Sequence, residues 1–282
     1  MIKDSGDLNA LTKAASSLIC LKDEMNKRFY NKVILRELIP ADQSILYDLD
    51  EQILHSLQSF ASANTSIYTN SFSTELLGTR VWIHEGDSSP LWLESKKHDT
   101  SYQPFYATWL TSAYLLVKVA LSLGYTEIID IGSGDGRLDY CAAMLGVKSF
   151  GIEIDPTLVS LQLKISQSTK TKYEIFEADA TRFNYKSLLL KRPIFFISGL
   201  PEMGEMLANS VIDHVRKINT LNECGFCFMG SHSMRWLSRD HTLWGWGSVL
   251  SSHDLKWRFT ITLPTQWTHD QPFDTPYVFA SL

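Results

Sequence analysis

Cysteine is scarce in this sequence, with four residues in 282. Small disulfide-stabilised domains are much richer in cysteine, so that class of fold is excluded. Long apolar runs are missing too. The most apolar predicted helix, Ala113–Leu123, contains Lys118 and is shorter than the roughly 20 residues that a membrane span needs. We therefore expect neither a disulfide scaffold nor a membrane-spanning segment.

The sequence also lacks an excess of positive charge. Lysine and arginine number 26 against 31 acidic residues, and 26 − 31 gives a net charge of −5. Without an overall basic field, we expect neither nucleic acid nor an anionic membrane as a partner. The first residues, MIKDSGDLNALTK, lack the apolar core of a signal peptide. We expect a cytoplasmic protein with one large or two modest domains.

Two of the cysteines, Cys224 and Cys227, form a C-x-x-C pattern that is typical of metal and redox sites. The surrounding residues, GFCFMG, are typical of a buried strand. Side chains three residues apart in a strand point to opposite faces, so these two sulfurs cannot share a metal ion. We predict that both cysteines pack in the core, and we predict no metal site.

The most informative stretch is residues 127–155, EIIDIGSGDGRLDYCAAMLGVKSFGIEID. An apolar run leads into Asp130 and a G-x-G-x-G turn over residues 132–136. A helical pattern follows, and a second apolar run then ends at Glu153. Strand, glycine turn, helix, strand and acid are the signature of a βαβ unit that holds a nucleoside-containing cofactor. Glycine lets the backbone approach such a ligand, and Glu153 would accept hydrogen bonds from its ribose diol.

The charges around this turn distinguish between cofactors. Arg137 stands where the dinucleotide motif has its third glycine, and Asp130 and Asp135 flank the turn. A pyrophosphate at a helix N-terminus needs positive potential, so two carboxylates there would repel NAD. S-adenosylmethionine has no phosphate and carries a sulfonium and an ammonium group, which an acidic loop attracts. We therefore predict S-adenosylmethionine as the cofactor. An NAD-dependent oxidoreductase and a non-catalytic binding protein are the alternatives.

Helices are predicted on both sides of this unit. A helix from Pro104 to Leu123 should begin near the ligand, at Tyr106–Thr108. Asp155-Pro156 is typical of a helix start, with an N-cap followed by proline. A further helix should start at Pro201.

Strands continue the alternation after this unit. They are expected at residues 173–178, 193–197 and 226–229. Asp179 follows the first of these and is placed to accept a hydrogen bond from an adenine amino group. Alternation over residues 257–263 and an apolar run at 277–280 predict a terminal antiparallel hairpin, with residues 264–275 as the return loop.

Residues 1–100 differ in character and are predicted to form a mainly helical extension of a domain at 101–282. Apolar residues at helical spacing predict helices from Leu8 to Phe29 and from Ile45 to Phe60. The Ser/Thr/Asn-rich stretch 61–78 is typical of a loop. Residues 79–84 and 90–94 are predicted to pair as a hairpin.

The motif D-I-G-S-G-D-G-R at residues 130–137 resembles motif I of the class I methyltransferases, with Glu153 at their ribose-binding acid. A terminal hairpin is also how that family ends. Within the class, FISGLPEMGEML at 196–207 and Gly230-Ser231-His232 are similar to the archaeal protein-lysine methyltransferases and the non-SET histone-lysine methyltransferases. The resemblance implies an α/β fold: a Rossmann-like class I methyltransferase sheet with a C-terminal antiparallel β-hairpin.

The resemblance also implies a site. The expected cofactor-binding residues are Thr108, Asp130, Gly132, Ser133, Gly134, Asp135, Gly136, Glu153, Ile154, Asp179, Ala180 and Ser198. Ser198 and Glu202 are the expected catalytic residues, and Glu202 or Glu205 would hold an incoming ammonium group. A protein lysine amine is the expected acceptor. A small molecule or RNA is the alternative, because the archaeal enzymes often carry tyrosine where this chain has Ser198.

Two tryptophans in a glycine-flanked loop, Trp244 and Trp246, are candidates for an aromatic wall around an amine, which attracts a cation through its π faces. Core packing is the equally weighted alternative for both.

Overall fold

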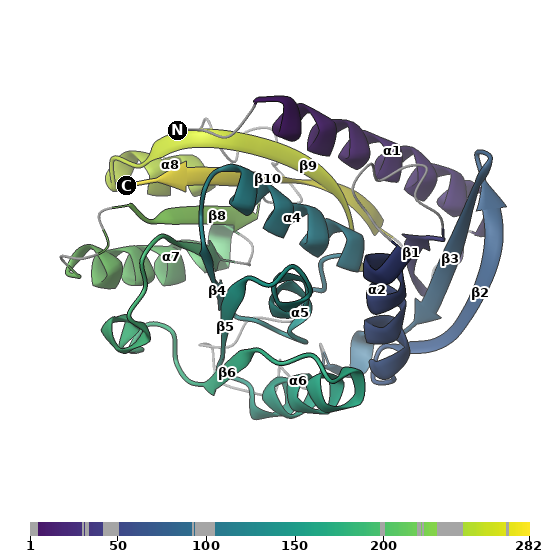
Figure 1. The fold of residues 1–282 in the computed structure, drawn as a ribbon, viewed down its shortest axis with the longest axis horizontal. Coiled ribbons are helices and arrows are strands. Elements are labelled where there is room, and N and C mark those ends of the chain that lie inside the picture. Colours follow the sequence, from purple (N-terminus) through teal and green to yellow (C-terminus); the bar gives the residue numbers. More distant parts are fainter. Residues whose placement is uncertain are drawn as a thin grey trace.

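The computed structural model describes residues 5–29, 31, 34–41, 51–91, 93, 105–197, 201–218, 221, 223–229, 245–268 and 271–282. These residues form a large sheet in the order β6-β5-β4-β7-β8-β10-β9 and a small one in the order β1-β3-β2. Figure 1 shows the large sheet between helices, with the small sheet at one end of the molecule.

The large sheet confirms the predicted α/β topology. Its strands are β4 (Glu127–Ile131), β5 (Lys148–Glu153), β6 (Glu174–Glu177), β7 (Pro193–Ile197), β8 (Gly225–Met229), β9 (Lys256–Thr268) and β10 (Gln271–Ser281). The first five are parallel, whereas β10 inserts antiparallel between β8 and β9. The sheet therefore has the predicted Rossmann-like strand order, including the terminal antiparallel hairpin.

The strands bury alternate side chains on two faces. Ile194 and Phe196 of β7 belong to the core on the side of α4 (Leu110–Ser122), α5 (Arg137–Met144) and α6 (Pro156–Thr169). Phe195 and Ile197 belong to the core on the side of η1 (Tyr185–Leu188), α7 (Pro201–Arg216) and α8 (Gly245–Ser252). A strand that is buried on both faces needs a continuous apolar run, which explains PIFFI.

The two cysteines of the C-x-x-C pattern follow the same alternation. Cys227 belongs to the core on the α4 side, and Cys224 belongs to the core on the α7 side. Both thiols are buried and free. The prediction that both cysteines pack in the core is confirmed.

The terminal hairpin is longer than predicted, because residues 264–268 and 271–275 belong to strands rather than to a return loop. Proline is tolerated in a strand where its nitrogen has no ladder partner. Pro264 lies in the edge strand β9. Pro276 lies in the part of β10 that extends beyond β8, whose pairing with β10 begins at Tyr277.

The described part of the N-terminal region includes the helices α1 and α2 and a small antiparallel sheet. Its elements are α1 (Ser5–Phe29), β1 (Leu35–Pro40), α2 (Glu51–Ala63), β2 (Tyr68–Leu76) and β3 (Thr79–Gly86). The helix predicted to end at Phe29 is confirmed. The second predicted helix is present as α2, and its predicted start at Ile45 lies outside the described residues.

The prediction of a loop over residues 61–78 is wrong, because β2 occupies half of this stretch and pairs with β3. The two strands are joined by Leu77 and Gly78, whose φ angles are 49° and 78°. Two successive left-handed residues match the twist of a two-residue hairpin. The serines and threonines of β2 lie largely at exposed positions. The predicted pairing of residues 79–84 with 90–94 is also wrong, because β3 pairs with β1 and β2 and residues 89–91 are helical.

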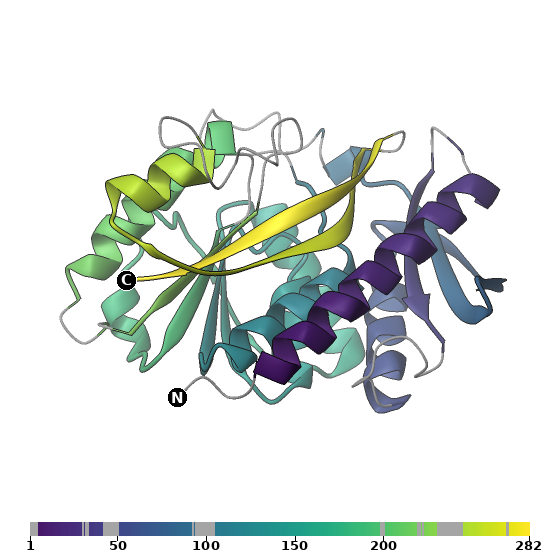
Figure 2. The ribbon, with the colours of Figure 1, turned by 90° about the horizontal axis from the view of Figure 1, so that it is seen from above.

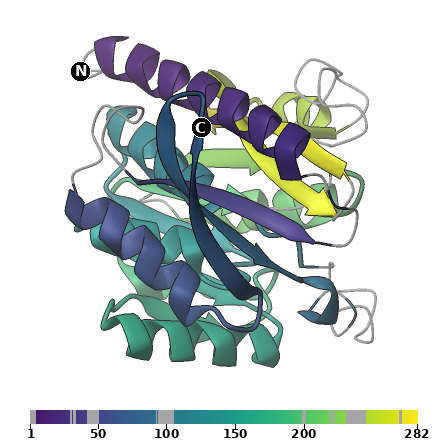
Figure 3. The ribbon, with the colours of Figure 1, turned by 90° about the vertical axis from the view of Figure 1, so that its right-hand side faces the viewer.

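The N-terminal region and the large sheet share one hydrophobic core. Leu18 of α1 and Phe60 of α2 lie in the same buried cluster as Tyr114 of α4 and Tyr140 of α5. Figures 2 and 3 show α1 running along the terminal hairpin, and Lys22 forms an ion pair of 2.5 Å with Asp274 of β10. The predicted boundary near residue 100 lies outside the described residues.

Candidate functional site

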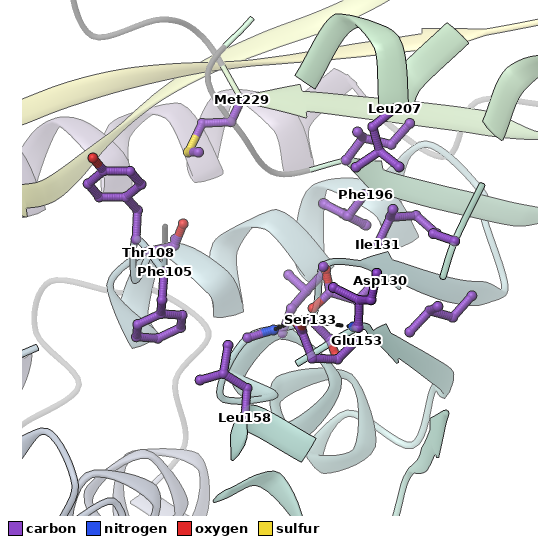
Figure 4. A pocket seen from close by; sticks show the side chains of 18 of the residues that line it. Phe105, Thr108, Asp130, Ile131, Ser133, Glu153, Leu158, Phe196, Leu207 and Met229 are labelled. Carbon is purple, nitrogen blue, oxygen red and sulfur yellow. Dashed lines mark hydrogen bonds between the residues drawn. The ribbon is translucent and has the colours of Figure 1, made fainter. Parts of the chain in front are cut away.

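A cavity of about 760 Å³ lies at the carboxyl ends of the parallel strands. In open α/β sheets this is where ligands bind. Ten of the predicted cofactor-binding residues line it: Thr108, Asp130, Gly132, Ser133, Gly134, Asp135, Glu153, Ile154, Asp179 and Ala180. Figure 4 shows Asp130, Ser133 and Glu153 close together, with Leu158 on one side of them and Phe196, Leu207 and Met229 on the other.

The glycine loop between β4 and α5 needs its glycines for different reasons. Gly132, Gly134 and Gly136 all have φ between 60° and 77°, where L-residues with a side chain are strained. A Cβ at Gly132 would meet no described atom within 4 Å, whereas one at Gly134 would lie 2.6 Å from the Phe105 ring. Gly136 does not line the cavity. A Cβ there would lie 2.5 Å from the Tyr173 hydroxyl, so packing behind the loop explains this glycine.

Glu153 ends β5 with its carboxylate fixed by the backbone. Its Oε2 accepts the Gly134 N–H at 2.8 Å, and its Oε1 accepts the N–H groups of Ile154 and Asp155, each at 2.9 Å. Burial raises the pKa of Glu153, and these three hydrogen bonds oppose that shift. The result is a pre-oriented acceptor at the edge of the glycine loop.

Asp130 is the last but one residue of β4 and is 4% exposed. Burial, together with the nearby charges of Glu153 and Asp135, raises the pKa of Asp130 to about 8. The raised pKa favours a proton on this carboxyl in the free protein. A cation placed next to it would favour the ionised form.

Asp135 has an ion-pair partner that the sequence pattern does not reveal. It was expected to add negative potential to the loop, but Arg137 pairs with it through both oxygens, at 2.8 and 2.5 Å. A paired carboxylate offers little net charge to a ligand. Arg137 itself lines the cavity, and the sequence pattern gave it no role beyond replacing a glycine.

The cavity nevertheless stays acidic. The described side chains that line it include one guanidinium, from Arg137, and five carboxyl groups, from Asp130, Asp135, Glu153, Asp155 and Asp179. Such a lining favours a cationic ligand over an anionic one.

Asp179 lies beyond the end of β6, as predicted. Its Oδ1 accepts hydrogen bonds from the backbone N–H and the hydroxyl of Thr181, at 2.8 and 2.6 Å. Ala180 follows Asp179 in the chain, and Ala180, Ile154 and Leu158 add apolar surface to the same cavity. A carboxylate beside an apolar wall suits a flat base with an exocyclic amino group.

Another wall comes from residues 105–108, which precede α4. The predicted start of this helix at Tyr106–Thr108 is wrong, because α4 begins at Leu110. Thr108 lines the cavity and shares a hydrogen bond of 2.8 Å with the hydroxyl of Tyr277 on β10. An isolated bridge to Thr265 of β9 ties the same segment to the terminal hairpin. Burial raises the pKa of Tyr277 to about 12, so its hydroxyl stays neutral. Tyr277 was not predicted as a site residue, because its partner Thr108 lies 169 positions away in the sequence.

The remaining wall is apolar and includes Phe196, Leu207 and Met229, with Met206 84% exposed at the rim. Ser198 and Trp244 lie outside the described residues, as does the side chain of Glu202. Two other predicted acceptor-site residues lie outside the lining described for the cavity. The Glu205 carboxylate accepts a hydrogen bond from Ser248 at 3.2 Å, and Trp246 is fully buried. Trp246 stacks on Phe228, so core packing is its role.

No protein-family model and no curated protein matches the sequence. Several solved structures are similar to part of the chain. The magnesium protoporphyrin IX methyltransferase of Synechocystis, solved with bound S-adenosylhomocysteine, is 14% identical over 61% of this chain and 80% of that chain, with a TM-score of 0.43. The N-methyltransferase NodS of Bradyrhizobium japonicum is 16% identical over 61% and 94%, with a TM-score of 0.43. The tRNA (uracil-54, C5)-methyltransferase of Pyrococcus abyssi is 16% identical over 63% and 40%, with a TM-score of 0.44.

The strand order of the large sheet carries the fold assignment. Within the described part of the chain, none of the helices combines the length and the hydropathy that a bilayer crossing requires.

Proposed function

We propose that the chain binds S-adenosylmethionine in this cavity and transfers its methyl group to an acceptor. The observation that carries the proposal is the acidic lining at the carboxyl ends of β4 and β5, next to a glycine loop that is open at Gly132. A sulfonium and an ammonium suit this lining, whereas the pyrophosphate of NAD would face carboxylates.

The residues that would hold the cofactor follow from their positions. Glu153 would accept from the ribose diol, and Asp179 would accept from the adenine amino group beside Ile154 and Ala180. Asp130 and the glycine loop would hold the amino-acid portion. When bound, the cofactor supplies an electrophilic methyl group, so the protein mainly positions and desolvates a lone-pair nucleophile.

For the acceptor, we propose a protein lysine amine. The resemblance of residues 196–207 to the protein-lysine methyltransferases supports it, as does the apolar wall of Phe196, Leu207 and Met229. Such a wall favours the neutral amine over the ammonium. Activity should then rise with pH, because an unperturbed lysine has a pKa of about 10.4. A small molecule or RNA is the alternative acceptor.

Two measurements test the proposal separately. Calorimetric titration of the protein with S-adenosylmethionine, S-adenosylhomocysteine and NAD should give heat only with the first two. Incubation with labelled S-adenosylmethionine and a cell lysate, followed by mass spectrometry, should place methyl groups on lysines. Label in RNA or small molecules alone would reject the lysine acceptor but keep the cofactor assignment. Binding of NAD alone would reject both.

A further inference from the structure

Arg137 connects the glycine loop with two other parts of the chain. It is 5% exposed and forms the two-point pair with Asp135 described above. Its Nη1 also donates to the Thr108 carbonyl on another wall of the cavity and lies 3.4 Å from Oε2 of Glu37. One guanidinium thus joins two walls of the cavity to the N-terminal region.

Glu37 of β1 is the N-terminal end of this connection, and it is 2% exposed. Its Oε1 accepts the N–H of Leu110, the first residue of α4, and its Oε2 accepts the hydroxyl of Tyr68. The N-cap residue of α4, Trp109, makes no side-chain cap bond. Glu37 therefore caps α4 from β1, a strand of the small sheet.

Asn64 holds the same loop from a second N-terminal element. It directly follows α2, is fully buried, and donates from Nδ2 to Oδ2 of Asp135 at 2.9 Å. Asp135 is therefore fixed by Arg137 on one side and by Asn64 on the other. Two charged groups buried in this way keep their geometry only while every partner is present.

We propose that Glu37 and Asn64 are positioning residues of the cofactor site, so that the N-terminal region fixes the glycine loop through the Asp135–Arg137 pair. Neither residue lines the described cavity, and both act through residues that do. This proposal rests on the proposed function for the identity of the ligand. The geometry of the loop can be tested without any ligand.

The first test is the affinity for S-adenosylhomocysteine by calorimetry. Glu37→Gln should raise Kd about tenfold, and Asn64→Ala about fivefold, because small displacements of a preorganised site are costly. Glu85→Gln is the matched control. Glu85 pairs with Arg36 of β1 at 2.7 Å but does not contact the loop, so its Kd should stay within about twofold of wild type.

The second test uses the free protein. Amide hydrogen exchange at Gly134 and Gly136 should be faster in Glu37→Gln and Asn64→Ala than in wild type, and unchanged in Glu85→Gln. A folded Glu37→Gln or Asn64→Ala variant with wild-type Kd and wild-type exchange overturns the proposal. If Glu37→Gln does not fold, Asn64→Ala decides alone. If wild type does not bind S-adenosylhomocysteine, the proposed function fails, and the exchange comparison alone decides on positioning.

Discussion

At the scale of single residues, the lone pairs of Glu153 limit how it can hold a ribose. A carboxylate offers about four acceptor positions, two on each oxygen. Oε1 uses both of its positions on Ile154 and Asp155, and Oε2 uses one on Gly134. One position on Oε2 is left for a ribose hydroxyl. We infer that Oε2 is the oxygen that faces the ligand.

Glu153→Gln tests this assignment. The amide would replace one charged oxygen with an N–H₂ group that faces backbone donors, so both the loop and the ligand lose a charge-assisted bond. We expect cofactor binding to weaken by about 1.5–3 kcal/mol in calorimetry. Glu177→Gln is the control, because Glu177 is exposed on the neighbouring strand at the register position of Glu153. Equal affinities of the two variants would contradict the role of Glu153.

The raised pKa of Asp130 predicts a pH dependence of binding. In the free protein the pKa is about 8, and a cationic ligand would lower it. Below pH 8 binding must therefore expel the proton, and Kd should rise about tenfold for each unit by which the pH falls, until the pKa of the bound state is reached. Above pH 8 this contribution is constant.

Calorimetry at pH 7 in buffers with different ionisation enthalpies measures this proton directly. Wild type should release close to one proton on binding S-adenosylmethionine, and Asp130→Asn should release fewer. The α-amino group of the ligand, with a reference pKa of about 7.7–8.0, is mostly protonated at pH 7 in both experiments. The same proton release in both proteins would place Asp130 away from the cationic groups.

At the scale of elements, the glycine loop is held by packing as much as by backbone preference. Gly134→Ala would combine a left-handed φ of 60° with a Cβ only 2.6 Å from the Phe105 ring. Gly146→Ala, after α5, has a similar φ of 68° but meets no described atom within 4 Å. Gly146→Ala should cost roughly 1–2 kcal/mol of unfolding free energy from the φ angle alone. Gly134→Ala should cost more and should also weaken cofactor binding.

Denaturant unfolding and calorimetry on both variants check this prediction. If Gly134→Ala is no more destabilising than Gly146→Ala, then Phe105 moves aside freely and does not constrain the loop.

Helices and strands that are specified by their own residues were predictable from the sequence. Those that depend on pairing with another part of the chain were not. The helix start at Asp155-Pro156 is confirmed, because the Asp155 side chain accepts the Thr157 N–H at 2.8 Å. The apolar strands β7 and β8 were predicted for the same kind of reason, since burial on both faces shows in each strand's own composition. Strand β2 was missed because its exposed face is polar, and only its pairing with β3 makes it a strand.

The residues of the candidate site likewise fall into those that the sequence predicts and those that it does not. Asp130, the glycines and Glu153 lie within one βαβ unit, where spacing reveals function. The roles of Tyr277 and Glu37, and the hydrogen bond from Arg137 to Thr108, depend on residues that are far away in the sequence. No local pattern reports such contacts. The ion pair with Arg137 neutralises Asp135, and the other acidic residues of the lining keep the cavity acidic.

At the scale of the whole molecule, the shared core argues against a detachable N-terminal region. The Phe60 ring packs edge-on against the Tyr140 ring, with 4.9 Å between the ring centroids. The Tyr140 hydroxyl donates to the Ser56 carbonyl at 2.8 Å. Together with Leu18 and Tyr114, these residues belong to one buried cluster that spans both regions. Removing the N-terminal region would expose the apolar faces of α4 and α5 to water.

We therefore predict that a chain of residues 101–282 does not fold cooperatively. It would lose the partners of α4, α5 and β9, the Leu110 cap from Glu37, and the ion pair between Lys22 and Asp274. Thermal unfolding followed by near-ultraviolet circular dichroism should show a sharp transition for the full chain. The shorter chain should show no sharp transition and should bind a dye that detects exposed apolar surface. A sharp transition near the full-chain midpoint would mean that residues 101–282 form an independent domain and that the N-terminal region is an accessory.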